Sequence, residues 1–273
     1  CESPPLFLGI TAVLIAKLKG SKLVFNVSDL WPESAEKLAI INNRFLINLA
    51  YRLESWIYKN SFLISGQTQG IVRSIKERFV NKKVVWFPNG VDIDFFEGDH
   101  EAIDWCLKLQ LPKENLVVLY AGIIGHAQGL EVIIEAAERV KLFPVSFIIV
   151  GDGPEKAKLQ KMVSDKKLTT LHFLPNLEKI KIPSLIKACN AYVVPLRKLD
   201  LFKGAIPSKL FEPLSLGKPI LLGVDGEAKE LFIERGKAGL YFEPENADEL
   251  SQRILTLLNN RSLGLELGAN GKN

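Results

Sequence analysis

The sequence predicts an α/β protein with two Rossmann-like domains, each built on a parallel sheet. Short apolar segments of strand length alternate along the chain with amphipathic segments of helical period. This alternation occurs before and after a charged stretch at 95–115, which we interpret as a linker. Strands that alternate with helices form parallel sheets with both faces covered. We therefore expect the C-terminal part of one domain at 1–94 and a second domain at 116–273.

The first part of the chain shows this alternation in its apolar pattern. Residues 23–27 form an apolar run that leads into a loop with Asp29, which is typical of a strand end. Phe45, Leu49 and Leu53 recur with helical period, and we expect this apolar face to pack on the sheet. The expected helices are 6–18, 43–61 and 68–79, and the expected strands are 22–31, 62–66 and 83–92.

The second part repeats the pattern more regularly. Asn246 precedes an amphipathic run and predicts a helix cap. Pro213 lies inside another helical segment, so we expect that helix to be short or kinked. The expected strands are 116–122, 145–154, 169–174, 191–196, 218–223 and 238–244, and the expected helices are 129–140, 155–166, 182–189, 206–217, 227–236 and 246–260.

Composition narrows the function classes. The 273 residues are 47% hydrophobic and carry a net charge of +4, which argues against a nucleic-acid binder and suits an anionic substrate or membrane surface. Cys1, Cys106 and Cys189 form neither a zinc pattern nor a disulfide framework, which favours a reducing cytosol. No group of residues has metal-ligand spacing.

The ends of the sequence and its apolar runs bear on localisation. The longest uncharged apolar run, at 6–16, has 11 residues, whereas a membrane span needs about 20. The start of the sequence has no signal-peptide layout. Because the sequence opens without Met and ends without an obvious finish, we interpret it as a fragment with a truncated N-terminal domain. We expect a cytoplasmic protein with peripheral contact at the inner face of the plasma membrane.

The segment IPSKLFE holds the strongest candidates for chemistry. Pro207 suits the first position of a helix, and Ser208 and Lys209 then lie near the helix N-terminus, where N–H groups favour phosphates. Lys209 can neutralise a diphosphate leaving group, and Glu212, one turn later, can accept hydrogen bonds from a ribose diol. The same pattern also fits an ordinary surface pair of lysine and glutamate at i,i+3.

Two further segments offer weaker candidates. GDGPEK (151–156) follows a strand and opens a helix, so it fits either a backbone approach to an anion or a tight structural turn. It lacks a full dinucleotide fingerprint, since Lys156 stands where the third glycine would be. SDLWPES (28–34) places Asp29 and Glu33 at a strand end, where they suit either an acceptor hydroxyl or helix capping. The helix 43–61 can also lie on a membrane.

Taken together, PNGVD, YAGIIG followed by QGLEVIIEAA, IVGDGPEKAKL, GAIPSKLFEPLSLGKPI and NADEL resemble, in this order, the retaining glycosyltransferases of family 4, which have the GT-B fold. SDLWPES and the PSK motif are similar to the branch that builds bacterial surface polysaccharides such as lipopolysaccharide and capsule, often as aminosugar transferases of the N-acetylfucosamine type. The resemblance covers nearly the whole chain.

The resemblance implies a retaining, metal-independent transfer of a hexosyl or aminosugar group from a nucleotide sugar, which we expect to be a UDP-sugar, to a glycan or polyprenyl-linked acceptor. The nucleotide sugar is a substrate, and no cofactor is implied. Lys209 and Glu212 are the catalytic candidates, and Asp29 and Glu33 are the acceptor-binding candidates. The nucleotide-sugar candidates are Gly122, Gly151, Asp152, Gly153, Phe173, Pro175, Arg197, Ala205, Ile206, Pro207 and Ser208.

The sequence departs from the family pattern at the diphosphate clamp. Glu212 matches the second glutamate of the E-x7-E motif, whereas Gly204 stands in place of the first. The usual basic pair would fall near Ile123 and Gln128, and neither is basic. Lys209, Arg197 and backbone N–H groups at 205–208 are candidates to replace the clamp. Two alternatives follow: a nucleotide-sugar 2-epimerase of the same fold, and a non-catalytic nucleotide-binding or scaffold relative.

Overall fold

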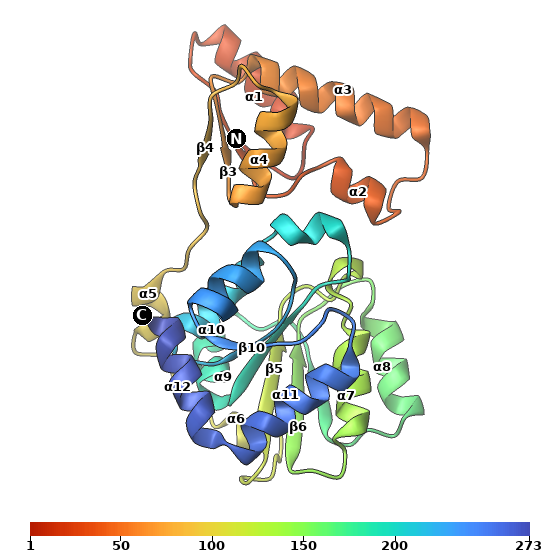
Figure 1. Ribbon diagram of the computed structural model, residues 1–273, viewed down its shortest axis with the longest axis vertical. Coiled ribbons are helices and arrows are strands. Elements are labelled where there is room, and N and C mark those ends of the chain that lie inside the picture. The colour runs from red at the N-terminus through yellow and green to blue at the C-terminus, as the bar shows by residue number, and fades with distance from the viewer. The chain divides into compact units, whose positions relative to one another are not determined.

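The computed structural model describes all residues from 1 to 273. The chain separates into two compact units, whose elements are labelled in Figure 1. The N-terminal unit comprises Cys1–Asn89 together with Lys203–Ile206, and the C-terminal unit comprises Gly90–Phe202 and Pro207–Asn273.

The N-terminal unit is built on a four-stranded parallel sheet. Its strand order is β1-β2-β3-β4. Side chains of the sheet and of the helices α1, α3 and α4 form a small core that includes Phe25, Ile57 and Ile75. The strands are β1 (Glu2–Ser3), β2 (Val24–Val27), β3 (Leu63–Gly66) and β4 (Val84–Trp86), and the helices are α1 (Leu8–Leu18), α2 (Glu33–Lys37), α3 (Arg44–Asn60) and α4 (Gln69–Arg78).

The C-terminal unit is built on a six-stranded parallel sheet in the order β10-β9-β8-β5-β6-β7. Its central strands are buried along their whole length, as expected for a sheet covered on both faces. The strands are β5 (Leu116–Ala121), β6 (Val145–Val150), β7 (Leu171–Leu174), β8 (Ala191–Pro195), β9 (Ile220–Gly223) and β10 (Gly239–Tyr241).

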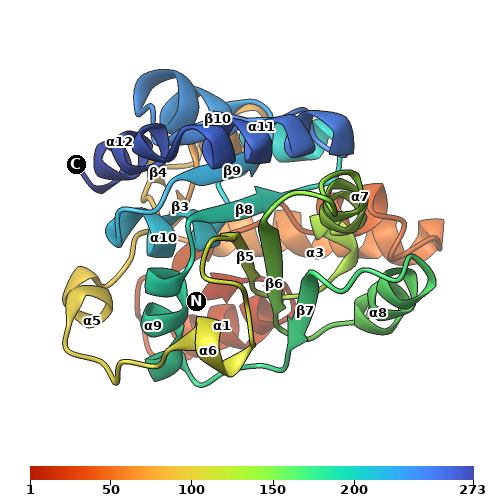
Figure 2. The ribbon, with the colours of Figure 1, turned by 90° about the horizontal axis from the view of Figure 1, so that it is seen from below.

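The helices of this unit lie on both faces of the sheet. Figure 2 shows α7 and α11 on one face and α9 and α10 on the other. The α-helices are α5 (Ile93–Glu97), α6 (Trp105–Lys108), α7 (Glu131–Arg139), α8 (Lys156–Asp165), α9 (Ile182–Ala188), α10 (Phe211–Ser215), α11 (Ala247–Asn259) and α12 (Arg261–Lys272). The remaining turns are the 3₁₀ helices η1 (His126–Gln128), η2 (Lys179–Lys181), η3 (Asp200–Gly204) and η4 (Ser208–Leu210), and the π-helix η5 (Lys229–Arg235).

The predicted α/β class with parallel sheets is confirmed, and several local predictions are confirmed with it. The side chain of Asn246 caps α11 by accepting a hydrogen bond from the N–H of Glu249. The expected helix 206–217 is divided into η4 and the short α10. Pro213 lies in the first turn of α10, where its missing N–H costs no hydrogen bond within that helix.

Other parts of the chain differ from the expectation. The stretch 95–115, expected to be irregular, contains α6, whose Trp105 is buried and donates a hydrogen bond from Nε1 to Ser184 Oγ at 3.0 Å. The expected apolar face of α3 does not pack as a whole, because Phe45, Leu46 and Leu49 are 74%, 50% and 54% exposed. On that helix Ile47, Ile57 and Tyr58 are buried instead.

Helix α12 was not expected, because its sequence RSLGLELGANGK contains three glycines, which disfavour a helix. Tertiary packing explains two of them. A Cβ atom at Gly268 would lie 1.9 Å from the carbonyl oxygen of Gly217, and one at Gly271 would lie 2.5 Å from Leu214 Cδ2. Gly264 has no such neighbour, because the atom nearest to a Cβ at that position would lie 3.8 Å away.

We therefore predict opposite effects for two alanine substitutions in α12. Gly268→Ala forces the new methyl group against a backbone carbonyl and is expected to lower the free energy of unfolding by about 1–3 kcal/mol. Gly264→Ala is the matched control and is expected to raise it by about 0.5–1 kcal/mol, because alanine favours the helix. Chemical denaturation measures both values, and equal effects of the two substitutions would contradict this account of the helix.

Candidate active site

The strand order of the C-terminal unit reverses its direction between β5 and β8, and the carboxyl ends of these two strands form a topological switch point. The chain moves from β5 outward to β6 and β7, then returns to β8 and continues in the opposite direction to β9 and β10. The helices that follow neighbouring strands therefore leave toward opposite faces at this point. Ligands of open parallel sheets bind at such switch points. This location is where the candidate residues of the two halves of the sheet meet.

A buried tyrosine of β8 forms hydrogen bonds to the backbone of β5 where the pairing of the two strands ends. Strands β5 and β8 pair only at Val118 with Ala191 and at Leu119 with Tyr192. Beyond this point the hydroxyl of Tyr192 donates to the carbonyl of Ala121 at 2.8 Å and accepts from its N–H at 3.2 Å. The side chain thus satisfies the backbone of β5 where the partner strand no longer does.

The loops after β5 and β6 pack backbone against backbone at this edge. Gly122 N–H donates to the carbonyl of Val150 at 3.0 Å, and Ile124 N–H donates to that of Asp152 at 2.8 Å. A Cβ atom at Gly151, whose φ is +141°, would lie 1.9 Å from Gly122 O. The glycines of the GDGP turn are therefore required by the fold of the two loops, whether or not a ligand is bound.

Lys209 lies at this switch point, beside the end of β5. Its Nζ donates to the hydroxyl of Tyr120 at 2.7 Å and lies 4.4 Å from the centre of the tyrosine ring. Burial, the largest cause, lowers the pKa of Lys209 to about 8, and the nearby carboxylate of Glu212 opposes this shift. A buried ammonium has lost part of its hydration. A bound anion, in addition to the carboxylate of Glu212, would therefore stabilise the charged form of Lys209.

Glu212 lies one turn further, in the first turn of α10. Burial raises its pKa, and the charges of Lys179 and Lys209 act in the opposite direction. Its carboxylate forms no salt bridge with either lysine, since Lys179 Nζ instead lies over the ring of Phe95 and Lys209 binds Tyr120. The two candidates are therefore half-buried neighbours rather than an exposed i,i+3 salt bridge.

Arg197, which follows β8, is already surrounded by acceptors. Its guanidinium contacts Glu245 at 3.0 Å and Glu131 at 3.2 Å, and its Nε donates to the carbonyl of His126 at 2.6 Å. These contacts join the loop after β8 to the loop after β5. A diphosphate would have to compete with two carboxylates for the guanidinium of Arg197. The role of Arg197 in a diphosphate clamp stays a prediction.

The other nucleotide-side candidates occupy varied positions. Phe173 lies on β7 and packs on the C-terminal core, while Pro175, just after it, is exposed. The carboxylate of Asp152 accepts from the N–H of Gly153 at 2.8 Å. Pro207 and Ser208 lie at the start of η4, and Ala205 and Ile206 belong to the segment that groups with the N-terminal unit.

In the N-terminal unit, the acceptor candidates Asp29 and Glu33 lie near the carboxyl end of β2. Asp29 accepts from the hydroxyl of Ser34 at 2.5 Å, and Glu33 pairs with Lys37 at 2.7 Å along α2. Asp29 does not cap α2, because no side chain caps its backbone N–H groups. Both residues are partly buried, and acceptor binding by them stays a prediction.

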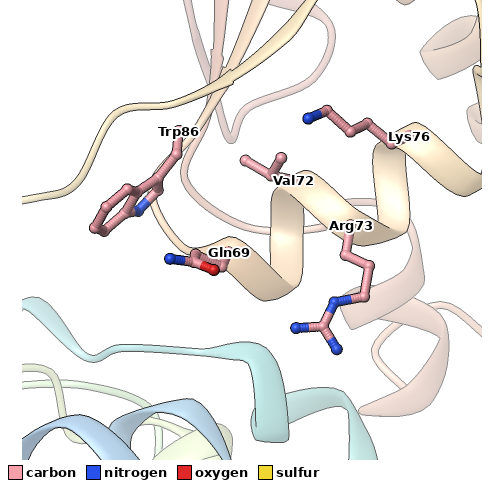
Figure 3. A pocket seen from close by; sticks show the side chains of 5 residues that line it. All are labelled: Gln69, Val72, Arg73, Lys76 and Trp86. Carbon is pink, nitrogen blue, oxygen red and sulfur yellow. The ribbon is translucent and has the colours of Figure 1, made fainter.

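The N-terminal unit also contains a pocket of about 360 Å³ that the sequence did not indicate. Figure 3 shows Gln69, Val72, Arg73 and Lys76 on α4 and Trp86 at the end of β4 around this pocket. Arg78, further along α4, is paired with the buried Glu54, whereas Arg73 and Lys76 have no carboxylate within salt-bridge distance. The spacing i, i+3, i+4 and i+7 of the four α4 residues was the signal available in the sequence.

The sequence also did not indicate Tyr120, because this residue lies within an apolar run that is typical of a buried strand. The structure brings together no group of three or more histidine, cysteine, aspartate or glutamate side chains that could hold a metal ion. None of its helices has both the length and the apolar character needed to cross a bilayer.

Comparisons with known proteins agree with this architecture. The putative colanic acid biosynthesis glycosyl transferase WcaI of Escherichia coli is 30% identical over 255 residues, which are 90% of this chain and 62% of WcaI. An N-acetylgalactosaminyltransferase of Campylobacter jejuni that acts on N,N'-diacetylbacillosaminyl-diphospho-undecaprenol is 26% identical over 238 residues, which are 83% of this chain and 58% of that protein. The chain spans 54–62% of the length of the first three curated relatives.

Solved structures share the fold at lower identity. HepE of Anabaena in complex with UDP-glucose superimposes with a TM-score of 0.79 at 20% identity, over 98% of this chain and 71% of that one. WaaG, a glycosyltransferase involved in lipopolysaccharide biosynthesis, superimposes with a TM-score of 0.70 at 18% identity, over 91% of this chain and 69% of that one. These neighbours have the GT-B fold, which confirms the expected architecture.

The family model described as glycosyl transferases group 1 matches residues 104–273, which contain the whole sheet of the C-terminal unit together with Lys209 and Glu212. Relatives of the chain take part in bacterial polysaccharide biosynthesis. The chain therefore belongs to the family of group 1 glycosyl transferases.

Proposed function

We propose that the protein transfers a sugar from a UDP-sugar to a lipid-linked or glycan acceptor during synthesis of a bacterial surface polysaccharide, with retention of anomeric configuration and without a metal ion. The observation that supports this proposal best is the pair of Lys209 and Glu212 at the switch point of the C-terminal sheet. The sugar that we favour is an aminosugar, on the resemblance of the PSK motif and on the transferase of Campylobacter jejuni.

Lys209 supplies the positive charge that this reaction needs. When the bond between the sugar and the diphosphate breaks, negative charge develops on the leaving phosphate oxygens. An ammonium held at the switch point stabilises that charge without a metal ion. Because the ammonium is partly desolvated before binding, the interaction is stronger than it would be in water.

Glu212 supplies a hydrogen-bond acceptor beside this charge. In the proposed complex its carboxylate accepts hydrogen bonds from the two hydroxyls of the ribose. Burial raises the pKa of Glu212, so its carboxylate is less well solvated than in water and hydrogen-bond donors from a ligand would compensate its charge. HepE, which shares this fold, was crystallised with UDP and with UDP-glucose, and this supports the choice of the nucleotide.

The pocket on α4 supports an acceptor that contains phosphate. Arg73 and Lys76 supply two positive charges, and Trp86, which is 49% exposed, supplies a flat face on which a sugar ring can stack. The name of the Campylobacter jejuni relative describes an acceptor with these features, a sugar on a lipid diphosphate. We propose that this pocket, with Asp29 and Glu33 on the same unit, binds the acceptor.

The exposed side chains of α3 support contact with a membrane surface, where a lipid-linked acceptor would be found. Phe45, Leu46 and Leu49 are exposed near the start of the helix, and Arg44 and Arg52 lie on the same helix. Apolar side chains flanked by basic residues suit the interface of a bilayer with anionic lipids. The proposed location is therefore the cytoplasmic face of the plasma membrane.

We predict that Glu212→Ala weakens UDP binding about 10- to 100-fold, which is the effect of losing hydrogen bonds to a charged group. Titration calorimetry of the chain with UDP in the absence of metal measures this effect. Glu266→Ala, which removes an exposed carboxylate on α12, is the control and is expected to bind UDP normally. Unchanged UDP affinity in Glu212→Ala would remove Glu212 from the nucleotide site.

We predict that UDP affinity falls as pH rises through about 8. The anion binds the protonated form of Lys209, whose pKa burial lowers to about 8, so affinity is full below this value and declines above it. The terminal phosphate, with a pKa of about 6, stays ionised over roughly pH 7 to 9.5. The limiting slope is about tenfold per pH unit. In Lys209→Met the affinity should be weak at every pH, and an identical pH profile in this variant would assign the decline to another group.

For the acceptor pocket, we predict that the double substitution Arg73→Gln and Lys76→Gln weakens binding of a water-soluble prenyl-diphosphate sugar about tenfold or more. Each lost charge removes one charge-assisted contact to phosphate. Binding of UDP by the same variant should not change. The double substitution Lys19→Gln and Lys83→Gln, at two exposed lysines of the same unit, removes the same net charge and is the control. Equal weakening by the control would show that the pocket itself is not involved.

A further inference from the structure

We propose that Tyr120 is a positioning residue, which holds the ammonium of Lys209 at the place where the diphosphate of the nucleotide sugar binds. This inference rests on the proposed function, because it concerns how that site orients its positive charge. Tyr120 lies on β5 and is fully buried, so it acts on a ligand through Lys209 rather than by contact.

The hydroxyl of Tyr120 has a defined hydrogen-bond direction. It lies 2.6 Å from the carbonyl oxygen of Ile123, which can only accept, so the single hydroxyl proton is donated there. The oxygen lone pairs are then directed to accept, and Lys209 Nζ donates to them at 2.7 Å. Burial raises the pKa of Tyr120, which keeps the hydroxyl proton available for this role.

The ring and the neighbouring backbone define the same position for Nζ. The ammonium lies 4.4 Å from the ring centre, which is within the range of a cation–π interaction. A Cβ atom at Gly122 would lie 3.0 Å from Nζ, so the absence of a side chain at Gly122 leaves the space that the ammonium occupies. Hydroxyl, ring and glycine therefore restrict the ammonium from three sides.

The backbone that carries Tyr120 is itself fixed. The next residue, Ala121, is held on both its N–H and its carbonyl by the hydroxyl of Tyr192. Strand β5 is also one of the two central strands of the sheet, paired with β6 along its whole length and with β8 at Val118 and Leu119. Movement of Tyr120 would therefore require rearrangement of the core.

A flexible lysine needs such a support more than an arginine would. Its ammonium is a point charge on a four-carbon chain, and ordering that chain costs conformational entropy when a ligand binds. Ile123 and Gln128 supply no second cation in the loop after β5, and Arg197 is engaged by Glu131 and Glu245. Lys209 is therefore the cation of this site that is not engaged by a carboxylate and whose position is set in advance by Tyr120. One of its N–H groups binds Tyr120, and two remain for phosphate oxygens.

The test compares UDP with uridine, which lacks the phosphates, in the variant Tyr120→Phe. This substitution keeps the ring and removes only the hydroxyl. We expect UDP binding to weaken about five- to tenfold while uridine binding stays unchanged, since the ammonium faces only the phosphates. A general disturbance of the fold would weaken both ligands. Tyr58→Phe, which removes a buried hydroxyl from the N-terminal unit, is the control and should leave both affinities unchanged.

A double-mutant cycle with Lys209→Met completes the test. If Tyr120 acts through Lys209, then Tyr120→Phe has no further effect on UDP binding in the Lys209→Met background. Wild-type UDP affinity in Tyr120→Phe, or the same loss in both backgrounds, would overturn the inference while leaving the proposed role of Lys209 intact. Unchanged UDP affinity in Lys209→Met alone would overturn the proposed role of Lys209, and the inference with it.

Discussion

Strands β5 and β8 are neighbours at the centre of one sheet, yet their chains continue toward opposite edges. The helices that follow these two strands, α7 after β5 and α10 after β8, therefore pack on opposite faces of the sheet, as expected at a topological switch point. Their pairing ends at Leu119 and Tyr192, and the Tyr192 hydroxyl satisfies the backbone beyond that point. The close packing of Gly122 against Gly151 and the placement of Lys209 both depend on this geometry.

The charges at this edge are arranged unequally. Arg197 is engaged by Glu131 and Glu245 and joins two loops, which is a structural use of a cation. Lys209 instead has a neutral hydroxyl and an aromatic ring as its closest partners, and burial lowers its pKa to about 8. In the proposed complex, a bound diphosphate would therefore change the environment of Lys209 more than that of Arg197.

The N-terminal unit, considered by itself, offers two kinds of surface. Around the α4 pocket, Arg73 and Lys76 carry charges without carboxylate partners beside the exposed Trp86. On α3, Phe45, Leu46 and Leu49 are exposed although their period is that of a packed helix face. Both surfaces suit an amphiphilic molecule with a phosphorylated head group, which is the chemistry of the proposed acceptor.

The sequence alone determined the alternation of strands and helices, the α/β class and the cap at Asn246, because these depend on local periodicity and hydrogen bonding. The ordered motifs also indicated Lys209 and Glu212. Contacts between residues far apart in the sequence became known from the tertiary structure alone. Helix α12 forms despite its glycines because Gly268 meets the backbone of Gly217, and Tyr120 meets Lys209, 89 positions away. Such pairs follow from strand order and close packing, which no local pattern of residues encodes.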